Sequence, residues 1–167
     1  MSHPNQGLPP ADPRAGRPEA AACLRGAGDR LARVAIEEAV KRDPTLSDRY
    51  SELELRHLLR DYERHIEQLA RAMETGQDRF VTEYAEWLVP LYRRRHIQAK
   101  DLANLVRGLQ AAATAVVSPV DLPALAASCE AWVKVLEFHR RLPGDHPGNP
   151  VVRFAFKGAG ILDDSVV

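Results

Sequence analysis

The chain has 167 residues, which fits one domain, since domains typically run to about 100–200 residues. Its composition is 45% hydrophobic and 28% charged, within the globular range and far from that of a disordered chain. The formal net charge is zero, so the chain lacks the basic excess with which a nucleic-acid binder displaces counterions from phosphate, and we expect no nucleic-acid partner.

Membrane spans and secretion are not expected either. The apolar runs stay far below the roughly 18 residues that a bilayer span needs. Residues 1–28 contain no apolar h-region of a secretory signal, and the two cysteines, Cys23 and Cys129, are too few for a disulfide framework. A cytoplasmic location follows by default.

Residues 1–27 hold five prolines and almost no large apolar side chain, which predicts a disordered arm. The first helix is expected over residues 29–43, with Asp29 as its N-cap. Ser51 and Glu54 have the spacing of a capping box and predict a helix over residues 52–75. Gly76 is expected to end that helix.

The third helix is expected from Asp78 to His96, with a kink or break at Pro90, because proline deletes a helical hydrogen bond. Two further helices are expected over residues 100–118 and 121–141. Gly108 would let a neighbouring backbone approach closely. The sequence thus predicts an all-α, four- to five-helix bundle over residues 28–142, either a monomer or a homodimer, because every helix has an apolar face.

Residues 143–167 form the predicted C-terminal tail, which begins with proline and glycine breaks. Asn149 followed by Pro150 favours a short helix, although residues 152–156 could instead alternate as a strand. The tail carries four large apolar side chains that either fold back onto the bundle or dock on a partner: Phe154, Phe156, Ile161 and Leu162.

The candidate ligand-binding residues are Tyr84, Trp87, Trp132 and His139. Phe80, Tyr84 and Trp87 form an aromatic stripe on the third helix, and we expect Trp132 of the fifth helix to lie across from it. Such aromatic walls are typical of small-molecule pockets. His139 continues the stripe that Trp132 begins. Regulation by a small molecule or a protein partner is therefore the leading hypothesis, with no catalytic residue assigned.

Two alternatives concern the histidines and the arginines. Haem, another tetrapyrrole or a metal could be held through His65, His96 or His139, although no cofactor is identified. A di-iron site needs two Glu-x-x-His pairs, and Glu54 and His57 supply only one of them. The run Arg93, Arg94 and Arg95 could grip a phosphate or an acidic partner.

Residues 92–109 carry a family resemblance. The arginine-rich helix end Tyr92-Arg93-Arg94-Arg95-His96 leads through a short turn into Asp101-Leu102 and then Leu105-Val106-Arg107-Gly108-Leu109. This pattern resembles the helical sensor domains of stressosome co-antagonist proteins and of PucR-like regulators, over about residues 28–142. The resemblance implies a sensor or adaptor module that recognises a ligand or partner and has no catalytic signature. We expect it to differ from those proteins in having no effector domain after the helices.

Overall fold

A computed structural model describes residue 12 and residues 15–141 of the chain. Within these residues every regular element is helical, which confirms the predicted all-α class, and no helix has the length and apolarity needed to cross a membrane. The elements are α1 Pro18–Gly26, α2 Gly28–Arg42, α3 Leu46–Arg49, α4 Glu52–Thr75, α5 Arg79–Arg94, α6 Ala99–Ala113, η1 Pro119–Asp121 and α7 Leu122–Arg140. The sequence did not reveal the short helices α1 and α3. The predicted tail, with Phe154, Phe156, Ile161 and Leu162, lies outside the described residues.

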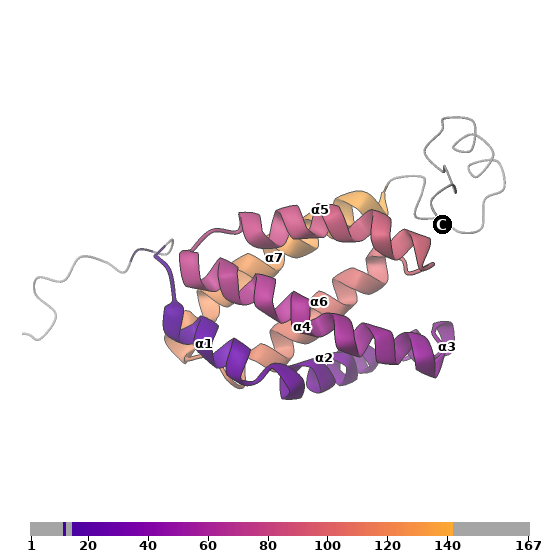
Figure 1. Cartoon of the computed structure of the whole chain (residues 1–167), viewed down its shortest axis with the longest axis horizontal. Coiled ribbons are helices and arrows are strands. Elements are labelled where there is room, and N and C mark those ends of the chain that lie inside the picture. Colours follow the sequence, from indigo (N-terminus) through magenta and orange to yellow (C-terminus); the bar gives the residue numbers. More distant parts are fainter. Residues whose placement is uncertain (1–11, 13–14, 142–167) are drawn as a thin grey trace, which may run out of the picture.

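The longer helices lie side by side around one core. In Figure 1, α5 and α7 lie along one side of the molecule and α2 along the opposite side, with α4 and α6 between them. Because α6 returns the chain between them, α5 and α7 run in the same direction. Asp78 at the start of α5 accepts a hydrogen bond from Ser128, and Arg93 near its end donates one to the His139 carbonyl.

The disordered arm predicted over residues 1–27 is wrong for its last third, which forms α1. Pro18 occupies the first helical position, where its missing N–H has no intrahelical partner to lose. Leu24 is fully buried, α1 packs on α4, and the backbone N–H of Arg17 donates to the Met73 carbonyl at 2.6 Å. Alanines make up much of the buried face of α1, and these small side chains let the two helices approach closely.

Both predicted ends of α4 are confirmed. The hydroxyl of Ser51 accepts from the N–H of Glu54 at 3.3 Å, and the Glu54 carboxylate accepts from the N–H of Ser51 at 2.7 Å. Gly76 ends the helix in the left-handed conformation, at φ 67°. The capping box and the glycine satisfy backbone groups that a helix leaves unpaired at its ends.

The close approach expected at Gly108 is confirmed and joins α6 to α2. A Cβ atom at position 108 would lie 2.2 Å from the carbonyl oxygen of Ala35 and 3.1 Å from the nitrogen of Ala39. The side-chain amide of Asn104 donates to the Ala39 carbonyl at 2.8 Å, which fixes the same contact one turn away. The backbone contact therefore requires glycine at this position.

The sequence predicted a kink or a break at Pro90, and helix α5 is not broken there. Pro90 lies on the exposed side of the helix, where water can hydrate the carbonyl that loses its N–H partner.

Helix α5 ends in a Schellman-type turn, with His96 at φ 60° and the Ile97 N–H donating to the Tyr92 carbonyl at 2.9 Å. Helix α6 also ends at Ala113, before the predicted residue 118.

Candidate functional site

Aromatic and imidazole rings from α4, α5 and α7 form one cluster in the bundle, here called the aromatic cluster. Its members are Tyr62, His65, Tyr84, Trp87, Tyr92 and Trp132. The rings of Tyr84 and Trp132 both lie 5.7 Å from that of His65, in edge-to-face geometry. Such pairs add packing energy beyond the area they bury. The structure therefore brings Tyr84, Trp87 and Trp132 together, with His65 as an additional central member.

His65 is buried and both of its ring nitrogens have partners. The hydroxyl of Tyr92 donates to the Asp61 carboxylate at 2.6 Å, so its oxygen is free to accept from Nε2 of His65, 3.4 Å away. A neutral imidazole has one donor and one acceptor, so Nδ1 accepts from the Tyr84 hydroxyl at 2.9 Å. Arg95 is the last member of this series of polar contacts and forms an ion pair with Asp61 at 2.6 Å.

Burial sets the charge state of His65. Desolvation lowers the pKa of His65 to about 4, because the charged imidazolium loses its hydration in the core. The Asp61 carboxylate opposes this shift and Arg95 adds to it. His65 is therefore neutral at pH 7, which is the form that the hydrogen bonds with Tyr84 and Tyr92 require.

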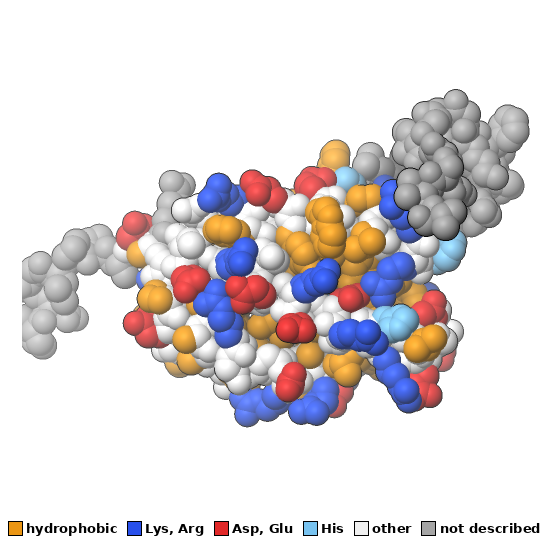
Figure 2. Space-filling model, viewed as in Figure 1, with side chains coloured by type: hydrophobic (Ala, Val, Ile, Leu, Met, Phe, Trp, Pro, Cys, Tyr) orange, Lys and Arg blue, Asp and Glu red, His pale blue; other side chains and the backbone are white. Residues whose placement is uncertain are grey.

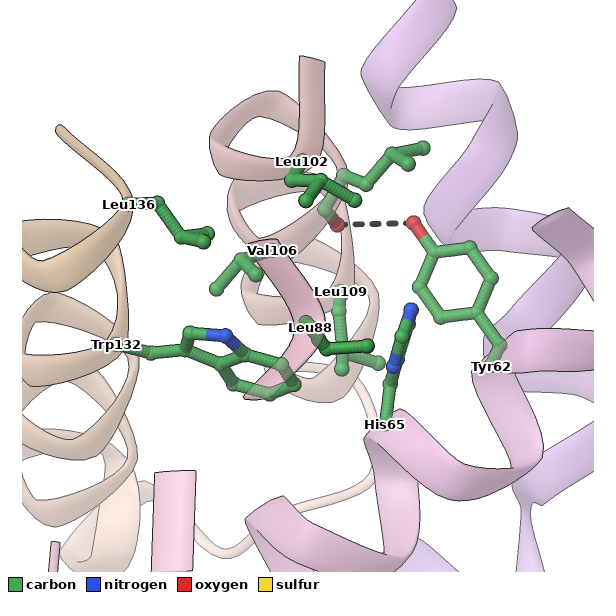
Figure 3. Close-up of a pocket in the computed structure, with 9 residues that line it drawn as sticks. Tyr62, His65, Leu88, Leu102, Val106, Leu109, Trp132 and Leu136 are labelled. Carbon is green, nitrogen blue, oxygen red and sulfur yellow. Dashed lines mark hydrogen bonds between the residues drawn. The ribbon is translucent and has the colours of Figure 1, made fainter. Parts of the chain in front are cut away.

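Figure 3 shows Tyr62, His65 and Trp132 around a small cavity in the core. Leucine and valine side chains complete its lining: Leu88, Leu102, Leu105, Val106, Leu109 and Leu136. Its volume is about 10 Å³, which is room for about one water molecule, so a tetrapyrrole does not fit without displacing the core. The described residues also contain no group of three His, Cys, Asp or Glu side chains able to hold a metal ion. The geometry around His65 thus gives no support to the cofactor alternative.

Trp87 differs from the rest of the cluster because it lies at the surface. Its side chain is 52% exposed, whereas Trp132 is fully buried. The Trp87 ring stacks on Tyr84, with the ring planes 20° apart and the centroids 5.8 Å apart. Figure 2 shows hydrophobic side chains gathered on the surface over α5, with charged side chains around them. The aromatic cluster therefore extends from the core to the outer face of α5.

His139 does not join the predicted site in the way the sequence suggested. It lies about two turns beyond Trp132 on α7, and its Nε2 pairs with the Glu86 carboxylate at 2.5 Å. No ring contact connects it to Tyr84 or Trp87 among the described residues. Its place in the site is taken by His65, which lies one heptad after Leu58 on α4 and is buried.

The arginine run at the end of α5 does not form one continuous basic surface. Arg95 is bound to Asp61 and stacks over the Tyr92 ring at 4.9 Å, and Arg93 binds the His139 carbonyl at 3.0 Å. Arg94 alone is exposed. The three side chains point to different sides because successive residues on a helix are rotated by about 100°.

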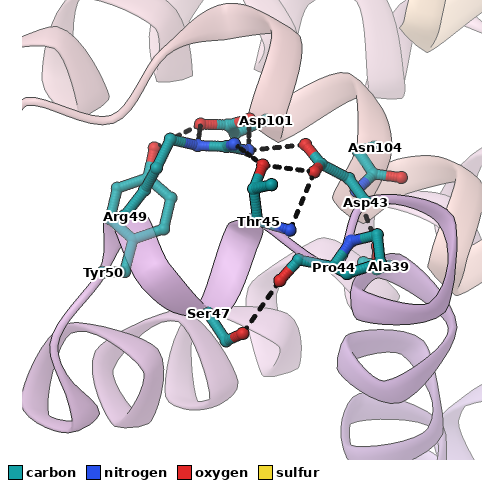
Figure 4. A network of polar contacts seen from close by, with 9 residues as sticks. All are labelled: Ala39, Asp43, Pro44, Thr45, Ser47, Arg49, Tyr50, Asp101 and Asn104. Atoms are coloured by element: carbon teal, nitrogen blue, oxygen red, sulfur yellow. Dashed lines mark hydrogen bonds and ion pairs between the residues drawn. The ribbon is translucent and has the colours of Figure 1, made fainter.

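A second polar network, which the sequence did not reveal, holds α3 against the start of α6 (Figure 4). The Asp101 side chain is 1% exposed and receives two hydrogen bonds from Arg49, at 2.7 and 3.3 Å. The Tyr50 hydroxyl donates to the same carboxylate at 2.5 Å, and Arg49 also pairs with Asp43 at 2.7 Å. Arg49 and Thr45 hold the pKa of Asp43 down at about 2. This network is fully engaged in joining three helix ends, which is a structural role.

No family model, curated protein or solved structure that was compared with the chain matches it. The resemblance to stressosome and PucR-like sensor domains therefore rests on the sequence pattern alone. In the structure, the residues that carry this pattern form the last turn of α5, the turn at His96 and most of α6.

Proposed function

We propose that this chain is a non-enzymatic regulatory protein, a bundle of α2, α4, α5, α6 and α7 that binds a protein partner through the face of α5 around Trp87. The observation that carries the proposal is a tryptophan that is 52% exposed while stacked on a half-buried tyrosine. Tryptophan and tyrosine are the residues that most often anchor protein interfaces. The exposed Trp87 ring and the Tyr84 ring on which it stacks together offer an aromatic surface to a partner on this side of α5.

The support beneath Trp87 is rigid, which favours binding. Tyr84 is fixed by its hydrogen bond to His65 and by edge contact with Trp132, 5.6 Å between centroids. An anchor whose geometry is already set loses little conformational entropy when a partner binds. The core cavity of about 10 Å³ favours a protein partner over a small molecule held inside the bundle.

Three buried side chains, those of His65, Asp101 and Cys129, support a role without catalysis. Both ring nitrogens of His65 are engaged, and the Asp101 carboxylate is held by Arg49 and Tyr50. Burial raises the pKa of the Cys129 thiol to about 12, so the nucleophilic thiolate does not form near pH 7. The sensor-domain resemblance adds the expectation that partner binding transmits a signal.

Affinity capture with matched variants tests this proposal. The wild-type chain, Trp87→Ala and Leu53→Ala would each be used to retain proteins from an extract of the cells that express it. Leu53 is the control because it is also exposed and apolar, at 61%, but lies at the start of α4. We expect Leu53→Ala to retain the same partner as the wild type and Trp87→Ala to lose it, with unchanged circular dichroism. Retention by Trp87→Ala would contradict the proposal.

A further inference from the structure

One line of exposed residues runs along the outer side of α5, here called the outer stripe. Its members are Glu83, Trp87, Pro90 and Arg94. Their spacings of four, three and four residues keep them on one face of a helix with 3.6 residues per turn. The residues on the opposite side of α5 are buried in the core: Val81, Ala85, Leu88, Val89 and Tyr92. The outer stripe is therefore the side of α5 that faces away from the bundle.

The outer stripe is complementary to itself. Positions 83 and 94, and also positions 87 and 90, lie symmetrically about the point between residues 88 and 89. A two-fold axis through that point would lay a second α5 antiparallel on the first. Glu83 would then face Arg94 of the second copy, and Trp87 would face Pro90 of the second copy. A two-fold interface requires this reciprocal pattern, in which one patch is used by both copies.

The charges at the two ends of the stripe are available for such pairing. Neither Glu83 nor Arg94 makes an ion pair with another described residue. By contrast, the nearby Glu86 is paired with His139 and Arg95 with Asp61. An antiparallel arrangement joins opposite charges at both ends, whereas a parallel one would set like charges together. The positions of Glu83 and Arg94 thus favour a second copy of α5 as the partner and the antiparallel orientation for it.

We infer that a second copy of this chain docks antiparallel on the outer stripe and forms a two-fold dimer centred on Trp87 and Pro90. This inference rests on the proposed function, because it names the partner that the Trp87 face binds. One helix face on each copy is a small interface, for which a dissociation constant in about the micromolar range is typical. The dimer therefore forms and dissociates with concentration, as a regulatory contact requires.

Sedimentation velocity of the full chain over a range of concentrations tests the inference with a charge swap. We expect the wild type to shift from monomer to dimer, and Glu83→Arg or Arg94→Glu alone to weaken association by about tenfold or more, because like charges then meet at both ends. The double variant carrying both substitutions should restore association to near that of the wild type. Glu130→Arg, at an exposed position of α7, is the control and should leave association unchanged.

Two results would overturn the inference. One is a wild-type chain that stays monomeric up to hundreds of micromolar, and the other is a double variant that associates no better than the single ones. If the wild-type chain is monomeric but captures a different protein, and Trp87→Ala does not capture that protein, the inference fails and the proposed function stands. If Trp87→Ala changes neither association nor capture, both fail.

Discussion

The hydroxyl of Tyr84 donates a hydrogen bond to Nδ1 of His65 across 2.9 Å, and this bond ties the exposed face of α5 to the bundle core. Trp87 stacks on the outer side of Tyr84, while His65 is 3% exposed and continues the chain of hydrogen bonds through Tyr92 to Asp61. A partner that contacts Trp87 thus rests on a side chain whose position the core determines.

Replacing Tyr84 with phenylalanine should destabilise the fold, because it leaves the buried Nδ1 of His65 without a donor. The expected loss is about 1–3 kcal/mol, the cost of an unsatisfied buried acceptor. Urea unfolding followed by circular dichroism measures it. Trp87→Phe, which keeps an exposed ring on Tyr84, is the control and should stay within about 0.5 kcal/mol of the wild type. Equal stability of Tyr84→Phe and the wild type would contradict the assigned hydrogen bond.

Stability should fall as the pH is lowered from about 6.5 towards 4 because of His65. The pKa of His65 is about 4 in the folded chain, below its ordinary value of 6.5, so the unfolded chain binds the extra proton in this window. The contribution is present in full above pH 6.5, and on the order of 3 kcal/mol is lost by pH 4. Unfolding titrations between pH 4.5 and 7.5 measure the slope. His65→Gln should flatten it, and a slope unchanged by this substitution would assign the effect to other groups.

Gly108→Ala should disrupt the contact between α2 and α6. The added Cβ atom would lie 2.2 Å from the Ala35 carbonyl oxygen, and backbone on both sides leaves no flexible side chain to move aside. We expect a loss of about 1–3 kcal/mol or more, as for overpacking in a core. Gly28→Ala is the matched control, since nothing lies within 4 Å of a Cβ atom there, and it should be neutral or stabilising. A lowered melting temperature for both variants alike would count against the close approach.

Asp101→Ala should be among the most damaging substitutions of a charged residue in the chain. It leaves Arg49 and the Tyr50 hydroxyl without their buried acceptor, and breaking such a pair costs about 3–5 kcal/mol. Asp48→Ala, an exposed aspartate of α3, provides the comparison and should change stability by about 0.5 kcal/mol or less. Thermal unfolding distinguishes the two, and similar melting temperatures would show that the network contributes little.

Helices with local signals were the predictable part of the fold. The ends of α4 followed from Ser51, Glu54 and Gly76, and the close helix contact followed from Gly108, because each depends on a residue type with one strong preference. Helix α1 was missed because the five prolines of residues 1–27 indicated disorder, although Pro18 lies at the first helical position and the alanines after it favour a helix. The packing of α1 on α4, a contact between distant parts of the sequence, could not be predicted from the local pattern.

The candidate site was predictable only in part. Helical spacing on α5 placed Tyr84 and Trp87 on neighbouring faces, and the contact of Tyr84 with Trp132 followed from the apolar stripe of α7. The central place of His65 depends on how α4 is rotated against α5, which the spacing within α4 does not specify. The Asp101 network likewise joins residues about 50 positions apart, a relation that only the folded chain creates.

Photo-crosslinking at position 87 tests the central claim most directly, namely that the outer face of α5 is the contact surface. A benzophenone amino acid would replace Trp87 in one full-length variant and Leu53, another exposed apolar residue, in the control. Illumination should give a crosslinked product at position 87, with the mass of two chains if the partner is a second copy, and none at position 53. No product at position 87, or equal yields at the two positions, would contradict the account.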